Sequence, residues 1–138
     1  MKSGDLVGKW KIEREVCDPL GHLKSRMHGM GNFLLLEPDE LIYQEQLWHE
    51  TDGDKLLFAT KFYRYFFKED SIEVYFHQEE SNRLFMTLPI GREMIGTSKC
   101  KEDRYRLKWD WVDDDQFLTL YTIKGPQKDY TIESRFLR

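Results

Sequence analysis

Residues 100 to 138 decide the fold, and they read CKEDRYRLKWDWVDDDQFLTLYTIKGPQKDYTIESRFLR. Polar turn signals at 101–103, 113–115 and 125–128 separate runs in which apolar and polar residues alternate. Alternation at period two is typical of strands with one buried face. The segment therefore predicts the closing strands of an antiparallel sheet.

The same pattern extends toward the N-terminus. Trp10, Ile12, Arg14 and Val16 fall on one face of a predicted first strand, and further strands follow at turn signals such as 51–54. We count about ten short strands and no amphipathic helix, as in a sandwich or barrel. Successive hairpins without long crossovers favour an all-β, antiparallel up-and-down barrel that forms a single domain over residues 1–138.

Two predicted strands have an unusual pattern. Gly29 and Gly31 share one face of the strand at 26–37, which indicates a bend or the close approach of a backbone or ligand. Residues 55–67 are apolar on both faces. This strand is either covered on both sides or presents an exposed aromatic face to a protein partner or to a second copy of the chain.

Composition excludes several classes of function. The chain has 138 residues, 40% of them hydrophobic, and a net charge of −4 without a basic block, which argues against nucleic-acid binding. Cys17 and Cys100 form no CxxC pattern, and no apolar run is long enough for a signal peptide or a membrane span. We therefore expect a reduced, cytoplasmic protein, with an organelle or a host cell as the open alternatives.

Two charged residues stand on faces that are predicted to point inward. Arg14 lies among Trp10 and other apolar residues, and Glu45 shares a face with Tyr43. Burying an unpaired charge costs several kcal/mol, so Arg14 and Glu45 either pair with each other or contact a ligand. A guanidinium beside tyrosine hydroxyls suits the head group of an acidic amphiphile.

Other candidate sites have simpler interpretations. Cys100, Asp103 and Tyr105 suggest a nucleophile with an acidic partner, or a buried cysteine followed by a turn and a core tyrosine. The stretch 125–129 suggests an anion-binding loop but lacks the glycines of a phosphate loop, so a turn with local pairing is the alternative. The histidines show no metal-ligand spacing; a haem ligand at His28 or His77 is a remote alternative.

The chain resembles two groups of proteins. The motif Gly8-x-Trp10 is similar to the first strand of lipocalins and fatty-acid-binding proteins, in which a basic residue near the C-terminus packs over the tryptophan; Arg138 suits that role better than Arg135.

The chain also resembles DUF6314, an uncharacterised family of lipocalin-like domains. The motifs that carry this resemblance are Gly8-x-Trp10 with Arg14, Gly29-x-Gly31-x-Phe33, Tyr43-x-Glu45, Tyr63-x-Tyr65, Val74-x-Phe76, Cys100-x-x-Asp103-x-Tyr105, Gly125-Pro126-x-Lys128-Asp129 and Arg138. Where the family pattern has a histidine two residues before the cysteine, this chain has Ser98.

These observations predict a non-enzymatic, lipocalin-like barrel that binds a small amphiphilic or acidic ligand in its interior, with no catalytic residue, no metal and an unknown cofactor. The expected ligand contacts are Arg14, Tyr43, Glu45, Trp10, Phe33, Tyr63, Phe85 and Tyr105. A structural or protein-interaction module with a filled core is the alternative. A third hypothesis is a small barrel enzyme that uses Tyr105, Asp103 or Glu45 as acid or base. Fold does not determine function. The volume of the interior distinguishes ligand binding from a module with a filled core.

Overall fold

The computed structural model describes residues 1–50, 58–77 and 83–138, and its ten strands form one antiparallel sheet. A 3-10 turn, η1 (Ser3–Asp5), precedes them. The strands are β1 (Gly8–Cys17), β2 (Leu23–Glu37), β3 (Glu40–His49), β4 (Phe58–Phe67), β5 (Ser71–Phe76), β6 (Leu84–Pro89), β7 (Glu93–Cys100), β8 (Asp103–Asp113), β9 (Gln116–Lys124) and β10 (Asp129–Leu137). This arrangement confirms the predicted all-β meander.

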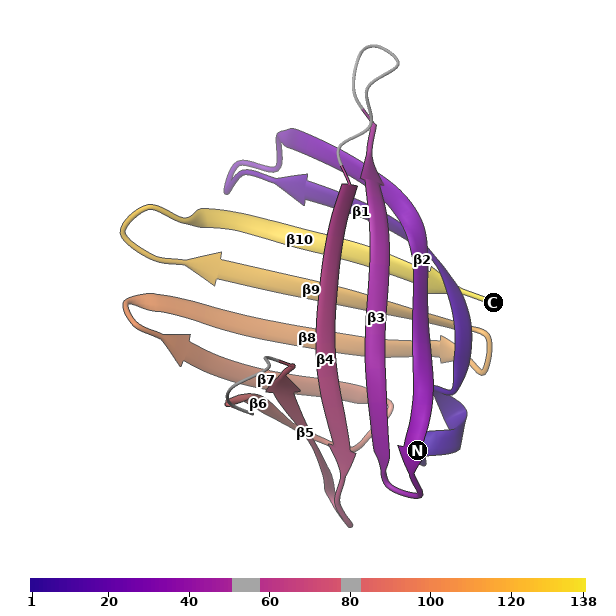
Figure 1. Cartoon of the computed structure of the whole chain (residues 1–138). Helices are drawn as coiled ribbons and strands as arrows, with labels where there is room; N and C mark the ends of the chain where they lie inside the picture. Colours follow the sequence, from indigo (N-terminus) through magenta and orange to yellow (C-terminus); the bar gives the residue numbers. More distant parts are fainter. Residues whose placement is uncertain (51–57, 78–82) are drawn as a thin grey trace.

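The sheet curls into a nearly closed barrel, with β1 hydrogen-bonded to both β2 and β10. In Figure 1, β2, β3 and β4 cross steeply over β7 to β10. The order of strands ends at β6 and β7, which form the seam of the barrel. Gly96 permits the close approach there, since a Cβ at this position would lie 2.7 Å from Leu88 Cδ2 and 2.9 Å from the carbonyl oxygen of Thr87.

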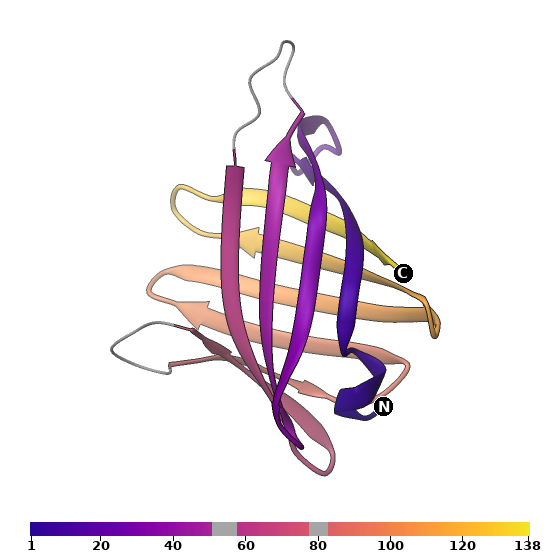
Figure 2. The same ribbon diagram turned by 45° about the vertical axis from the view of Figure 1, so that its right-hand side comes forward.

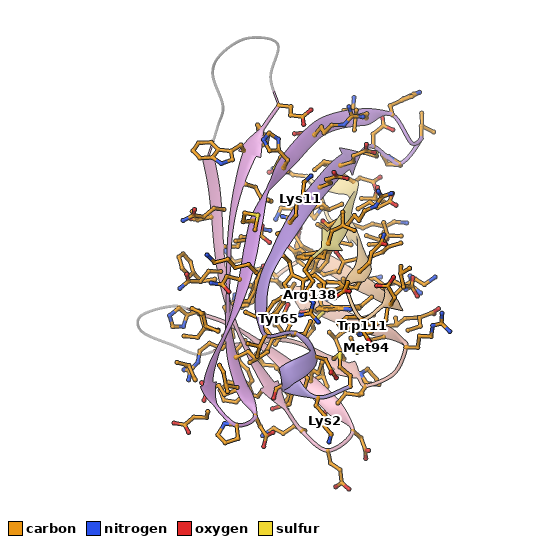
Figure 3. The ribbon with its side chains drawn as sticks, turned by 90° about the vertical axis from the view of Figure 1, so that its right-hand side faces the viewer. Lys2, Lys11, Tyr65, Met94, Trp111 and Arg138 are labelled. Carbon is orange, nitrogen blue, oxygen red and sulfur yellow. The ribbon has the colours of Figure 1, made fainter. Side chains whose placement is uncertain are left out.

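The N-terminal residues close one end of the barrel, which we call the plugged end. The η1 turn lies beside the start of β1 (Figure 2), and Trp10 Nε1 donates a hydrogen bond to the carbonyl of Leu6 at 2.9 Å. The Arg138 guanidinium lies 4.1 Å from the centre of the Trp10 ring and donates to three backbone carbonyls. Figure 3 shows Arg138 and Trp111 beside this turn. The predicted partnership of Arg138 with the tryptophan is confirmed.

The opposite end is the mouth, where β1 ends at Cys17 and β10 begins at Asp129. In Figure 1 the turns that join β1 to β2, β7 to β8 and β9 to β10 lie along its upper and left sides. The predicted turn at 51–54 and the turn residues at 79–82 lie outside the described residues. None of the described helical segments is long and apolar enough to cross a membrane.

The register resolves residues 58–67 of the ambiguous strand predicted at 55–67, and residues 55–57 lie outside the described residues. Tyr63 lies opposite Tyr43 of β3, and Tyr65 and Phe67 share its inward face. Phe62 points outward and remains 44% exposed. Strand β2 begins three residues earlier than predicted, because the pairing with β1 continues through a register shift near Cys17.

Candidate functional site

A buried ion pair crosses the interior of the barrel between β1 and β3. Arg14 Nη1 donates to Glu45 Oε2 at 2.6 Å, and Nη2 donates to Glu45 Oε1 at 3.1 Å. Arg14 Nε donates to the hydroxyl of Ser134 at 2.7 Å, and the Tyr43 hydroxyl donates to Glu45 Oε1 at 2.8 Å. Glu45 is only 4% exposed. The two charges therefore satisfy each other with the bidentate geometry that a guanidinium and a carboxylate favour.

The register and one glycine bring these groups together. Ser134 of β10 lies opposite Arg14, and Gly31 of β2 lies opposite Glu45. A Cβ at Gly31 would stand 3.0 Å from the Tyr43 hydroxyl. The absence of a side chain on β2 therefore gives Tyr43 the room to lie along the wall and reach the carboxylate, a close approach that the paired glycines predicted.

The pair stabilises the charged form of both partners. Burial by itself raises the pKa of Glu45, but the charge and hydrogen bonds of Arg14 outweigh burial and lower that pKa below its ordinary value. Burial alone lowers the pKa of Arg14, and Glu45 reverses the effect and raises it. Burial, together with the charge of Glu45, raises the pKa of Tyr43 well above its usual range. The network at neutral pH is thus a guanidinium, a carboxylate and a neutral phenol.

A cavity of about 40 Å³ lies beside this network. Its lining comprises Arg14, Phe33, Tyr43, Glu45, Lys61, Tyr63, Tyr65, Leu107, Trp109, Thr119, Tyr121, Ile132 and Phe136. This volume holds roughly two or three water molecules, whereas pockets for drug-sized ligands measure about 300–1,000 Å³. Aromatic side chains fill most of the interior that the sequence predicted to be a ligand site, so the volume by itself favours the interaction module over a preformed ligand pocket.

Unpaired hydrogen-bond donors surround the cavity. The hydroxyls of Tyr63, Tyr65 and Tyr121 form no hydrogen bond with another described residue. Burial raises the pKa of Tyr63 to about 12 and that of Tyr121 well above the ordinary value, so these phenols stay protonated at neutral pH. Trp109 Nε1 is buried and finds no partner in the described part of the chain. Polar groups buried in this way normally hydrogen-bond to water or a ligand.

Lys61 adds a positive charge at the mouth. It lies opposite Glu45 in the ladder between β3 and β4, yet forms no ion pair with a described carboxylate. Although Lys61 is exposed at the mouth, the surrounding protein desolvates its ammonium and lowers its pKa, an effect that Glu45 partly offsets. The charges of Arg14, Glu45 and Lys61 leave the cavity with an excess of positive charge.

The structure places the eight predicted contacts in two groups. Arg14, Phe33, Tyr43, Glu45 and Tyr63 line the cavity. The other three lie elsewhere: Trp10 packs against Phe117 at the plugged end, while Phe85 and Tyr105 contact each other edge to face beside the cavity, with ring centres 5.4 Å apart.

The cavity also contains residues that the sequence did not single out for this role. Lys61 and Tyr65 share the parity of Tyr63, so an inward assignment of Tyr63 would have placed all three inside. Thr119 and Tyr121 share the parity of Phe117 on β9 in the same way.

The candidate thiol site does not form a catalytic dyad. Asp103 pairs with Lys128 at 3.1 Å, and Lys128 also donates to the Tyr105 hydroxyl at 3.2 Å. The Cys100 thiol instead accepts a long contact from Arg83 Nη2 at 3.7 Å. Residues 125–129 therefore form a turn whose lysine ties β10 to β8.

The described histidines make local contacts. His22 lies 3.1 Å from Asp18, His28 lies 3.3 Å from Glu50, and His49 hydrogen-bonds Ser25. Within residues 1–50, 58–77 and 83–138, no cluster of three or more His, Cys, Asp or Glu side chains has the geometry of a metal site.

Comparison with known proteins identifies a family and a fold. The model of a family of unknown function, DUF6314, matches residues 6–138. No curated protein matches the chain. The S-type phycobiliprotein lyase CPES from Guillardia theta superposes with a TM-score of 0.73 at 10% identity, covering 100% of this chain and 93% of the lyase. A redesigned β-barrel, mFAP1, bound to DFHBI superposes with a TM-score of 0.53 at 14% identity, covering 99% of this chain and 98% of the design. At these identities the structural likeness establishes the barrel fold alone.

Proposed function

This chain belongs to the DUF6314 family, and we propose that its barrel binds a small, partly apolar ligand that carries an acidic or carbonyl group. The observation that carries this proposal is the set of unpaired donors around the cavity. Hydroxyls of Tyr63, Tyr65 and Tyr121 and the ammonium of Lys61 all offer protons, and none has an acceptor among the described residues. A ligand with acceptor oxygens would satisfy them.

Arg14 and Glu45 have a different role in this proposal. Each satisfies the other, so a ligand that displaced either would leave a buried charge unpaired. Together with Tyr43 they form the wall that shapes the cavity. The acidic group of the ligand instead approaches Lys61 from the mouth.

The ligand body has to lie among the aromatic side chains at the mouth, because the cavity holds only about 40 Å³. Tyr63 and Tyr121 are half-buried there. Outward rotation of these rings would open the space that a ligand needs. Barrels of this shape that are bound to DFHBI and the phycobiliprotein lyase support a ligand-binding role for the fold by analogy alone.

Native mass spectrometry of the freshly purified chain, before and after organic extraction, tests the proposal. We expect a co-purifying mass that extraction removes. The stripped chain should then gain thermal stability from dodecanoate, retinoate or haem, and Lys61→Gln should reduce that gain while Lys11→Gln on the outer wall leaves it unchanged. No bound mass together with no stabilisation by any of the three compounds contradicts the proposal.

A protein-interaction module is the second candidate, and the filled interior favours it. Phe62 on the outer face of β4 is 44% exposed, and Leu34 on β2 is 43% exposed. Substitution of Phe62 by Ser would then abolish association with a partner or with a second copy of the chain. Sedimentation of the purified chain over a concentration series separates self-association from a monomer that binds only ligand.

A further inference from the structure

The outer wall of β7, β8 and β9 carries four cations that form no ion pair with a described carboxylate. Lys99 lies opposite Arg104, which lies opposite Lys124, and Arg106 occupies the next outward position on β8. All four are exposed, and none forms an ion pair with a described residue. We call these four residues the basic face.

The basic face differs from other parts of the outer wall, where several cations pair with carboxylates. Arg26 pairs with Glu15 at 3.2 Å. Lys108, on β8 itself, lies 3.8 Å from Glu93 and 3.7 Å from Asp110. Like charges placed directly opposite on neighbouring strands destabilise a sheet. A chain with a net charge of −4 nevertheless collects four of its cations in one place, which indicates that an anion neutralises them in use.

The face is also hollowed. A shallow depression of about 550 Å³ is lined by its four cations together with Thr97, Ser98, Tyr105 and Thr122. Thr97 and Thr122 flank Arg106 in the ladder. The outward positions of this lining supply two guanidinium groups, two ammonium groups and the hydroxyls of Thr97 and Thr122, and no residue of the lining is a carboxylate. Arginine forks match the oxygens of phosphate with paired hydrogen bonds.

We propose that the basic face binds a compact polyphosphate, meaning a small molecule or ion with two or more linked phosphate groups. The row from Lys99 to Lys124 spans three neighbouring strands, or roughly 10 Å. Carboxylates border it: Asp129 lies opposite Lys124 on β10, and Glu102 stands in the turn after β7. These carboxylates would repel a longer polyanion such as RNA, or an anionic membrane, because either would extend over them. A compact polyphosphate is short enough to contact the four cations without reaching the carboxylates.

Calorimetric titration of the full chain with inorganic tripolyphosphate in about 50 mM KCl tests this assignment. We expect saturable binding with one molecule per chain, weakened about tenfold by Arg104→Gln and further by Arg104→Gln with Arg106→Gln. Lys108→Gln is the matched control on the same strand, and we expect it to change the affinity less than about twofold.

Thermal melting shows whether the variants fold; both arginine variants should melt no lower than the wild type, because they relieve repulsion. Absence of saturable binding to the folded wild type overturns the proposal. It is equally overturned if Lys108→Gln weakens binding as much as Arg104→Gln. Binding of polyglutamate, single-stranded RNA or phosphatidylserine vesicles in preference to tripolyphosphate also overturns it, since those probes represent other classes of partner.

Discussion

Separating Arg14 from Glu45 should destabilise the barrel by several kcal/mol. Two unit charges about 4 Å apart attract by roughly 4 kcal/mol at an effective dielectric constant of about 20. Removing one partner also leaves the other buried and unpaired, and measured losses of this kind are about 3–5 kcal/mol. We therefore expect Arg14→Met to lower the free energy of unfolding by about 3–5 kcal/mol, since it also removes the donor to Ser134.

The double variant distinguishes pairing from general damage to the core. Glu45→Gln alone leaves the Arg14 guanidinium without a countercharge, whereas Arg14→Met with Glu45→Gln leaves no buried charge. We expect the double variant to lose less than the sum of the single losses, by about 2 kcal/mol or more. Urea unfolding followed by the fluorescence of the four tryptophans measures each value.

The exposed pair of Glu15 on β1 and Arg26 on β2 provides the control, since it joins two strands of the same sheet on the outer face. Its coupling energy should stay below about 1 kcal/mol. Additive losses at Arg14 and Glu45 would refute the conclusion that the two charges stabilise each other directly.

The pH dependence of stability gives a second readout of the same pair. The pKa of Glu45 is lower in the folded chain than its ordinary value. Its stabilising contribution is therefore complete above the unfolded pKa of about 4.3 and disappears as the pH falls through the folded pKa. The wild type should lose more stability than Glu45→Gln on acidification below about pH 5.

Two further predictions concern how the barrel closes. Arg138→Gln should lower the free energy of unfolding by about 2 kcal/mol, because it removes the cation from Trp10 and several hydrogen bonds. The control Arg135→Gln on the outer wall should lower it by less than about 1 kcal/mol. Equal losses would show that Arg138 does not secure the plug. Gly96→Ala should lower the free energy of unfolding by about 1–3 kcal/mol, because the added methyl group crowds the seam. Gly4→Ala, which has open space around it, should leave the melting temperature nearly unchanged. An unchanged melting temperature for Gly96→Ala would argue against tight closure of the seam.

The alternation of apolar and polar residues predicted that Arg14 and Glu45 point inward, but only the alignment of the strands shows that they pair. Period two placed Arg14 and Glu45 on inward faces because successive side chains of a strand point to opposite sides. Their contact depends on β1, β2 and β3 lying side by side with Gly31 opposite Glu45. A single sequence contains no signal for that alignment, so ion pairing and ligand contact both remained open, with ion pairing favoured.

Strand β4 illustrates the limit of periodicity. Its aromatic residues occupy both parities, and only pairing with β3 and β5 places Tyr63 inside and Phe62 outside. Lys61 was missed although it shares the parity of Tyr63, which was an expected contact and therefore placed both residues on the same face. The volume of the interior is also beyond sequence reasoning, since it depends on how the rings of many strands pack together.

The sign of the charge in the cavity argues for the chemistry of its ligand. Arg14 and Glu45 neutralise each other, so Lys61 supplies the net charge of the site. A cationic ligand would place a second positive charge beside an ammonium that the surrounding protein already desolvates, and repulsion would oppose its binding. A carboxylate or carbonyl oxygen would meet Lys61 and the phenols of Tyr63 and Tyr121, all of them donors. Because Arg14 and Glu45 neutralise each other, the donors that remain favour a ligand that enters the barrel with a hydrogen-bond acceptor.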